Sequence, residues 1–340
     1  MLRHGGASLL HFEELPLSLR FEGFPGEIVQ SIARRWLCTV RAAEDDEGAY
    51  RVSLLEEPRL RVPHPPSVGP ERQVRLWAST VDSTTQLRMP GARTSFAAGR
   101  PRAQVEVHPL LLRSPSLMEL AVGGPLGHAL ALSGASFLHG AAFVVDDLPI
   151  LLLGEAGSGK STAAAAAQAA GGTVVSDDSL ILYPKAADGL AVRALRRDLI
   201  LRGASLEVLS GSLRDQLQHV GPTTDPRWVL DREGAASAFC TTLEPAAVCV
   251  LRRDRRLKSF RLVALSHAMA LTSLLEANAS PHLLHPAFPR EQQRLLSLWS
   301  RLTSSLPAFE LRLGPAVLDS PAEVLGEVVA RLRTLTPEAP

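Results

Sequence analysis

Short stretches in which apolar and polar residues alternate are the main pattern in the first third of the chain. They occupy residues 50–57, 73–80, 94–99 and 103–108 and are separated by proline, glycine and charged residues. Alternation with a period of two places one face of a strand against a core and the other toward water. Residues 1–112 are therefore expected to form a small β-rich N-terminal unit, either a cap or a substrate-binding part.

The spacing of apolar residues becomes helical over residues 114–133. Gly123, Gly124 and Pro125 interrupt this stretch, so two short helices or one kinked helix are expected. The stretch is expected to begin a second domain, residues 113–340, which would hold the catalytic machinery and end in helices.

Strands and helices alternate in this second part of the chain. Strands are expected over residues 135–145 and 149–155, with Asp146 and Asp147 as the turn of a hairpin. Further elements follow the same logic: a helix over 160–170, strands over 173–184 and 246–253, and helices over 266–278, 290–302 and 321–333. This order predicts an α/β fold.

Composition narrows the classes of function. The 340 residues carry a formal net charge of +1, which provides no large field to attract nucleic acid or an anionic membrane. Charges interrupt the N-terminal apolar residues, and no apolar stretch reaches the roughly twenty residues that span a bilayer. Neither a nucleic-acid partner nor a membrane partner is expected. The protein is expected to be cytoplasmic. The three cysteines lack a CxxC spacing, which argues against a zinc site.

A glycine-rich segment between the strand at 149–153 and the helix at 160–170 carries the clearest chemical signal. It fits the phosphate-binding pattern GxxxxGK[ST] in full. The expected nucleotide-binding residues are Gly154, Glu155, Ala156, Gly157, Ser158, Gly159, Lys160, Ser161 and Thr162. Because strand and helix flank the pattern as required, a glycine turn that merely starts a helix is the weaker alternative.

The residue types in this segment indicate ATP with Mg²⁺. Glycines let successive backbone N–H groups turn toward a phosphate, and the helix N-terminus adds positive partial charge. Lys160 supplies a cation, and the Ser161 hydroxyl can coordinate a magnesium ion that bridges two phosphates. Binding alone names no reaction, because kinases, GTPases, motors and transporters share this pattern.

Two acidic residues and one histidine are the candidates for chemistry. Asp177 and Asp178 end an apolar run that follows the helix and a Gly-Gly turn, which would return them beside the phosphate loop. One could hold metal while the other takes a proton; an exposed turn is the alternative. His139 lies on the strand expected to pair with the loop's own strand, although a lone histidine in an apolar strand is more often structural.

Arginine is expected at the phosphates, because phosphoryl transfer spreads negative charge over the oxygens. Arg196 and Arg252 are favoured for their closeness to expected strand ends, against the common alternative of a solvated charged face. Other arginines in the same two segments are Arg193, Arg197, Arg202, Arg253, Arg255 and Arg256.

The segments FLHGAAFVVDDLPILLLGEAGSGKST and GGTVVSDDSLIL resemble the catalytic domain of the HPr kinase/phosphorylase family. The resemblance covers residues 132–182 well. It implies a P-loop α/β kinase domain related to phosphoenolpyruvate carboxykinase, which phosphorylates a serine hydroxyl. Carried over, Asp177 matches the general base, Asp178 its metal-associated neighbour, with Ser161 as a further metal ligand, and His139 the histidine near the base.

Two departures separate the chain from true HPr kinases. Thr162 stands where those enzymes usually have Glu, and no EIRGLG signature follows downstream. HPr is therefore not the expected acceptor, and the reverse phosphorylase activity is not implied. Divergent relatives occur beside genes for ribosomally made, modified peptides, which implies a precursor peptide or small protein with an acceptor hydroxyl as partner, and the family implies a homo-oligomer. An ATP sensor without transfer and a small-molecule kinase remain the alternatives.

Overall fold

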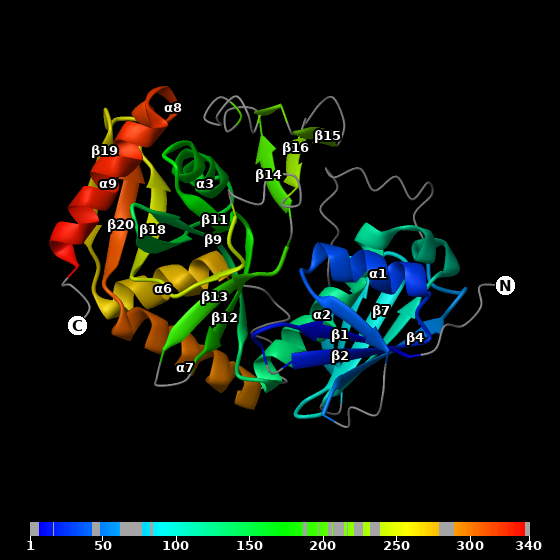
Figure 1. The fold of residues 1–340 in the computed structure, drawn as a ribbon. Coiled ribbons are helices and arrows are strands. Elements are labelled where there is room, and N and C mark those ends of the chain that lie inside the picture. The colour runs from blue at the N-terminus through cyan, green and yellow to red at the C-terminus, as the bar shows by residue number, and fades with distance from the viewer. Residues whose placement is uncertain are drawn as a thin grey trace. The chain divides into compact units, whose positions relative to one another are not determined.

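The computed structural model divides the chain into two compact units (Figure 1), which are described separately. The first comprises residues 1–136 and 280–296, and the second residues 137–279 and 297–340. The structure describes residues 7–15, 17–42, 48–61, 77–81, 84–185, 189–196, 198–202, 206, 214–215, 217–220, 227–231, 239–278 and 289–336.

An eight-stranded sheet forms the first unit, where the alternating pattern predicts a β-rich unit with four strands; β4, β5, β7 and β8 correspond to the expected ones. Its order is β3-β1-β2-β4-β8-β7-β6-β5, antiparallel except that β4 runs parallel to both β2 and β8. The strands are β1 Ser8–Phe12, β2 Leu17–Glu22, β3 Thr39–Ala42, β4 Tyr50–Glu56, β5 Trp77–Val81, β6 Thr84–Met89, β7 Ala92–Ala97 and β8 Arg102–Val107. Strict alternation of burial along β2 and β7 shows one face packed and the other partly exposed.

Two helices pack together against this sheet, α1 (Gly26–Arg35) and α2 (Pro115–Leu132), with the 3₁₀ turn η1 (Pro109–Arg113) leading into α2. Buried Glu119 of α2 accepts hydrogen bonds from Arg35, at 2.6 Å, and from the Trp36 indole, at 3.0 Å. Two short helices were one expectation here, but α2 is a single helix that continues through Pro125. Because α2 packs on the sheet, the first compact unit ends at Ser136, later along the chain than the expected boundary at 112.

A second stretch of chain, the start of α7 (Pro289–Ser305), also belongs to the first unit. The buried carboxylate of Glu291 accepts the Gly99 N–H at 2.7 Å and lies 3.9 Å from the His128 ring. His128 in turn shares a 2.8 Å hydrogen bond with the Tyr50 hydroxyl. Burial lowers the pKa of His128 to about 4, although Glu291 acts in the opposite direction. This buried network ties the first residues of α7 to the sheet and α2 of the first unit.

The second unit is built on a mixed nine-stranded sheet in the order β17-β13-β12-β9-β10-β18-β20-β19, with β11 also paired to β9. Its strands are β9 Ser136–Val145, β10 Leu148–Leu153, β11 Thr173–Ser176, β12 Ser179–Pro184, β13 Leu190–Ala194, β17 Thr242–Leu243, β18 Ala247–Arg253, β19 Phe260–Ala264 and β20 Ala308–Leu313. Asp146 and Asp147 both have positive φ and join β9 to β10 as a tight hairpin, as expected.

Helices cover both faces of this sheet (Figure 1). Helices α3 (Lys160–Ala169) and α9 (Pro321–Leu335) pack against each other over a core formed by alternate residues of β9, β10, β18 and β20. The short α8 (Ala316–Asp319) precedes α9. Helix α6 (His267–Asn278) contacts β10, β18 and β20 through residues outside that core. The expected helices over 160–170, 266–278, 290–302 and 321–333 all form.

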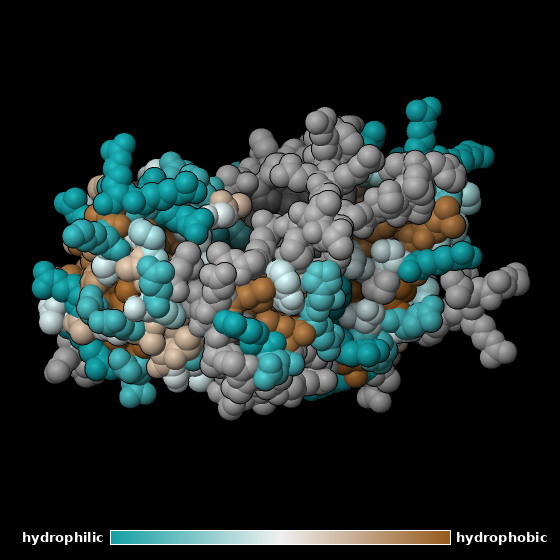
Figure 2. Space-filling view, turned by 90° about the horizontal axis from the view of Figure 1, so that it is seen from above, coloured by the Kyte–Doolittle hydropathy of each residue, from teal (hydrophilic) through white to brown (hydrophobic). Residues whose placement is uncertain are grey.

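A separate small sheet, β14-β16-β15, completes the described elements (Asp198–Arg202, Arg227–Asp231 and Gln218–Val220). Among the described residues, no helix is long and apolar enough to cross a membrane. On the face seen in Figure 2, hydrophilic and hydrophobic side chains of the described residues are interspersed.

Candidate active site

Sheet topology gathers the expected site segments at one edge of the second unit. Strands β10 and β18 are parallel, with Leu153 opposite Val250, so their carboxyl ends meet at the same edge. Strand β9 is antiparallel to β10 and places Gly140 opposite Leu153. Strand β11 is antiparallel to β9 and therefore ends at that edge too, at Ser176. Carboxyl ends of parallel strands are the usual place for ligands in α/β sheets.

The glycine loop, Gly154–Gly159, leaves β10 at this edge and leads into α3. A Cβ on Gly154 would stand 2.8 Å from the Leu251 carbonyl oxygen of the neighbouring strand, so no side chain fits there. Gly159 precedes the helix with a φ of +107°, a conformation that L-residues with side chains rarely adopt. The two glycines let the loop turn tightly and aim the first N–H groups of α3 at the space above it.

Lys160, the first residue of α3, is the cation of this loop. Its side chain is buried, and Nζ donates hydrogen bonds to the Gly154 carbonyl at 2.7 Å and the Glu155 carbonyl at 3.0 Å. Burial lowers the pKa of Lys160, while the nearby carboxylates of Asp178 and Asp177 act in the opposite direction. The loop carbonyls and the two aspartates thus surround one ammonium group.

Asp177 lies directly beside the start of α3. It is only 3% exposed, and its carboxylate accepts a hydrogen bond from the Ser161 hydroxyl. Burial, reinforced by the charge of Asp178, raises the pKa of Asp177 to about 7, against the effects of hydrogen bonds from Ser161 and from backbone groups. The pair of Ser161 and Asp177 therefore presents hard oxygen atoms at the mouth of the glycine loop.

Asp178 is in a different environment, with 43% of its side chain exposed. His139 Nδ1 lies 3.1 Å from one carboxylate oxygen, while the Ser179 hydroxyl donates to the other at 2.7 Å. Arg196 Nη1 lies 3.9 Å from that second oxygen. Burial alone would raise the pKa of Asp178, but the hydrogen bond and charge of His139, together with Ser179 and Arg196, lower it well below its usual range. Asp178 is therefore ionised at neutral pH.

Asn278, at the end of α6, fixes the position of His139. Its buried side chain accepts the His139 backbone N–H at 2.5 Å through Oδ1 and donates to the Leu274 carbonyl at 2.9 Å through Nδ2. The amide group thus ties the His139 segment of β9 to a helix on the face of the sheet. Sequence reasoning missed this residue, because a single Asn in a helical run carries no recognisable pattern.

Replacing Asn278 with Ala is expected to lower the free energy of unfolding by about 1–3 kcal/mol, because a buried N–H loses its acceptor. Urea denaturation of the purified variant measures this change. Thr272→Ala is the matched control on the same helix. Its exposed hydroxyl donates to the Ala268 carbonyl, so a change within about 0.5 kcal/mol is expected. Equal free energies of unfolding for the Asn278 variant and the control would show that the hydrogen bonds of the Asn278 side chain contribute nothing to stability.

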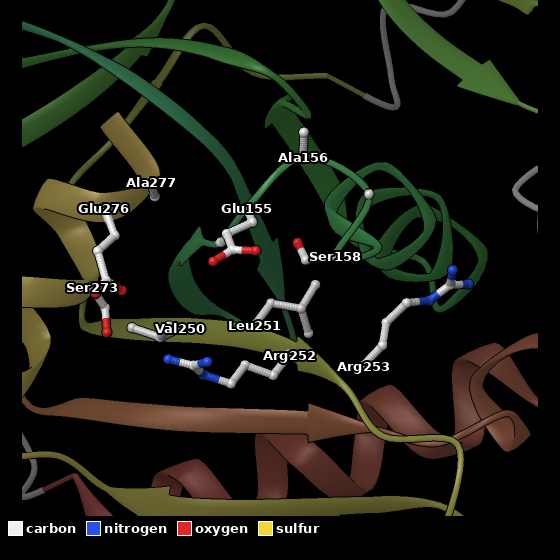
Figure 3. A pocket seen from close by; sticks show the side chains of 12 residues that line it. Glu155, Ala156, Ser158, Val250, Leu251, Arg252, Arg253, Ser273, Glu276 and Ala277 are labelled. Carbon is white, nitrogen blue, oxygen red and sulfur yellow. The ribbon is translucent and has the colours of Figure 1, made fainter. Parts of the chain in front are cut away.

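A pocket of about 320 Å³ opens between the glycine loop, the end of β18 and α6 (Figure 3). Arg252 and Arg253 line the pocket from the end of β18, while Ser273 and Glu276 line it from α6. Arg252 Nε pairs with Glu310 Oε2 at 3.0 Å, and the same carboxylate also pairs with Arg312. The pocket is at the small end of the range that holds small-molecule ligands.

The remaining arginines differ in their suitability for phosphate. Arg193 is buried within β13, while Arg255 and Arg256 are exposed in the turn after β18. Arg197 and the side chain of Arg202 lie outside the described residues.

The residues fit a magnesium ion that arrives with a nucleotide. Within the described part of the chain, no group of three or more His, Cys, Asp and Glu side chains is arranged to hold a metal. Magnesium is usually held by one or two carboxylates together with substrate phosphates, and it prefers oxygen donors. The Ser161 hydroxyl and the Asp177 and Asp178 carboxylates supply such donors at one place.

Comparisons with known proteins include a weak likeness to a solved structure. No protein-family model matches the chain, and no curated protein matches its sequence. Among solved structures, the Hpr(Ser) kinase/phosphatase from Coxiella burnetii is similar with 11% identity and a TM-score of 0.31, over 58% of this chain and 99% of that chain. This is a weak fold-level similarity to a kinase/phosphatase. It does not establish a family.

Proposed function

We propose that the chain is an ATP-dependent kinase that transfers the γ-phosphoryl group to a hydroxyl, most simply a serine of a peptide or small protein. One observation carries the proposal: the glycine loop with Lys160, two carboxylates and His139 meet at one edge of the sheet. A phosphate-binding loop alone would fit many classes of protein, whereas an adjacent pair of carboxylates supplies what a phosphoryl transfer needs.

The glycine loop and α3 would hold the phosphates of ATP. Backbone N–H groups at the start of α3 and the ammonium of Lys160 would bind phosphate oxygens, and Lys160 would exchange its bonds to the Gly154 and Glu155 carbonyls for phosphate. Bound Mg²⁺ would neutralise charge on the transferring group. Ser161 and a carboxylate would be its protein ligands.

The environments of the two aspartates favour Asp177 as the metal ligand and Asp178 as the general base. The family resemblance implies the opposite assignment. Asp177 is buried and bonded to Ser161, which places it on the metal side of the site. Asp178 is half-exposed and paired with His139, which makes it the carboxylate that an incoming hydroxyl can reach. The pKa values are the counter-argument, because a base works best with a pKa near the working pH. The pKa of Asp177 is raised to about 7, whereas that of Asp178 is held below its usual range, and both directions favour Asp177 as base. A bound cation would, however, lower the pKa of Asp177 again.

In this arrangement the acceptor oxygen attacks the γ-phosphorus in line with the leaving group. A bond forms between the acceptor oxygen and phosphorus, the bond from phosphorus to the β,γ-bridging oxygen breaks, and the hydroxyl proton passes to Asp178. ADP leaves with the electron pair of the broken bond. His139 orients Asp178 through the 3.1 Å contact.

The closest rival is an ATP sensor that uses the same loop without phosphoryl transfer. A test uses purified protein, Mg-ATP and the short peptides encoded beside its gene, with mass spectrometry of the products. A peptide heavier by about 80 Da, the mass of one phosphoryl group, supports the kinase. ATP bound without ADP or phosphopeptide supports the sensor, and phosphorylation of a small metabolite in place of a peptide supports a small-molecule kinase.

A further inference from the structure

We propose that Arg253 binds the phosphate groups of the nucleotide, a role for which Arg196 and Arg252 are less suited. This inference rests on the proposed function, because it assigns a residue to the same nucleotide site. It concerns the end of β18, where two consecutive arginines point in opposite directions (Figure 3).

Strand geometry places Arg253 beside the glycine loop. Side chains two apart on a strand share a face, so Arg253 lies on the face of Leu251, which packs in the core beneath α3. Arg253 Nε lies 3.8 Å from the point that a Cβ on Gly159 would occupy. Its side chain extends along α3 in Figure 3, whereas Arg252 points away from that helix.

The charge of Arg253 is not paired with an acidic side chain in the part of the chain that the structure describes. Arg252 is paired with Glu310 at 3.0 Å, and Arg196 lies 3.9 Å from Asp178. Arg253 forms no hydrogen bond or ion pair with any residue that the structure describes, and this includes the pocket's two acidic residues, Glu155 and Glu276.

The position of this cation is electrostatically unfavourable without an anion. The N-terminus of a helix carries positive partial charge, so a cation is normally found at the other end. Here Arg253 and Lys160 both lie at the start of α3. A polyphosphate would relieve this repulsion, and the planar guanidinium fork can bind two of its oxygens at once.

The test compares binding of Mg-ADP by isothermal titration calorimetry in wild type, Arg253→Gln and Arg255→Gln. Arg255 is the matched control, because it is exposed in the adjoining turn and does not line the pocket. We expect Arg253→Gln to weaken Mg-ADP binding about 10- to 100-fold, as for loss of charge-assisted hydrogen bonds, and Arg255→Gln to bind like wild type. Arg253→Lys should recover part of the affinity, since it keeps the charge and loses the fork.

Binding of adenosine separates phosphate contact from a general change of the pocket. Its affinity should be the same in wild type and Arg253→Gln, and a parallel loss for adenosine and Mg-ADP would contradict the phosphate assignment. Wild-type affinity of Arg253→Gln for Mg-ADP would overturn this inference and leave the proposed function intact. Failure of the wild-type protein itself to bind Mg-ADP or Mg-ATP would instead remove the proposed function, and this inference with it.

Discussion

Replacing Asp178 with Asn is expected to reduce the rate of phosphoryl transfer by about 10²- to 10⁴-fold, the usual contribution of a positioned general base. Affinity for Mg-ATP should change little, because Asp177 and Ser161 remain to bind the metal. Release of ADP from Mg-ATP with water as the acceptor measures the rate without knowledge of the natural substrate. Asp319→Asn is the control, since it removes an exposed carboxylate on α8 and should leave the rate unchanged.

The companion variant Asp177→Asn distinguishes the two assignments of the aspartates. With Asp177 on the metal side, this variant should bind Mg-ATP more weakly and require more magnesium for half-maximal rate. The opposite pattern, intact Mg-ATP binding with transfer lost in Asp177→Asn and preserved in Asp178→Asn, would restore the assignment implied by the family resemblance. Activity equal to wild type in both variants would remove the carboxylates from the chemistry altogether.

Replacing Lys160 with Ala is expected to have the second large effect, on binding and on rate together. Loss of a charge-assisted contact to phosphate weakens Mg-ATP binding about 10- to 100-fold, and loss of charge stabilisation in the transition state lowers the rate by a further 10²- to 10³-fold. Fluorescent-nucleotide titration and ADP release measure the two effects separately.

Two controls accompany the Lys160 variant: its melting temperature and a second lysine variant. Lys160→Ala also removes hydrogen bonds to the Gly154 and Glu155 carbonyls, so the melting temperature of the variant is measured to separate a loss of stability from a loss of binding. Lys185→Ala, which removes an exposed lysine paired with Glu244, should bind Mg-ATP like wild type. An unchanged melting temperature together with unchanged Mg-ATP affinity in Lys160→Ala would contradict the role given to the glycine loop.

Patterns that depend on neighbouring residues were readable from the sequence. The Asp146-Asp147 hairpin, the strand, loop and helix around Gly154, and the helices of the second unit all formed where expected. The return of Asp177 and Asp178 to the loop was predictable, because one helix and one strand allow little other geometry. The continuity of α2 was not predictable, because packing on the sheet outweighs the tendency of Gly123, Gly124 and Pro125 to break a helix.

Contacts between distant segments could not be predicted from one sequence. Asn278 meets His139 only because α6 packs on the same sheet as β9, and Glu291 joins the first unit although it follows most of the second in sequence. Sequence also could not rank the arginines. Arg252 and Arg253 are neighbours of the same type, and only the direction of each side chain from β18 separates an arginine paired with Glu310 from one beside the loop.

The most direct test of the central claim is phosphoryl transfer itself, measured by mass spectrometry after incubation of the protein with Mg-ATP and the peptides encoded beside its gene. We predict a product heavier by about 80 Da on a hydroxyl-bearing residue, formed together with ADP and formed about 10²- to 10⁴-fold more slowly with Asp178→Asn. Mg-ATP binding that is intact in the wild type, without ADP or any phosphorylated product, would contradict the kinase and leave a nucleotide sensor.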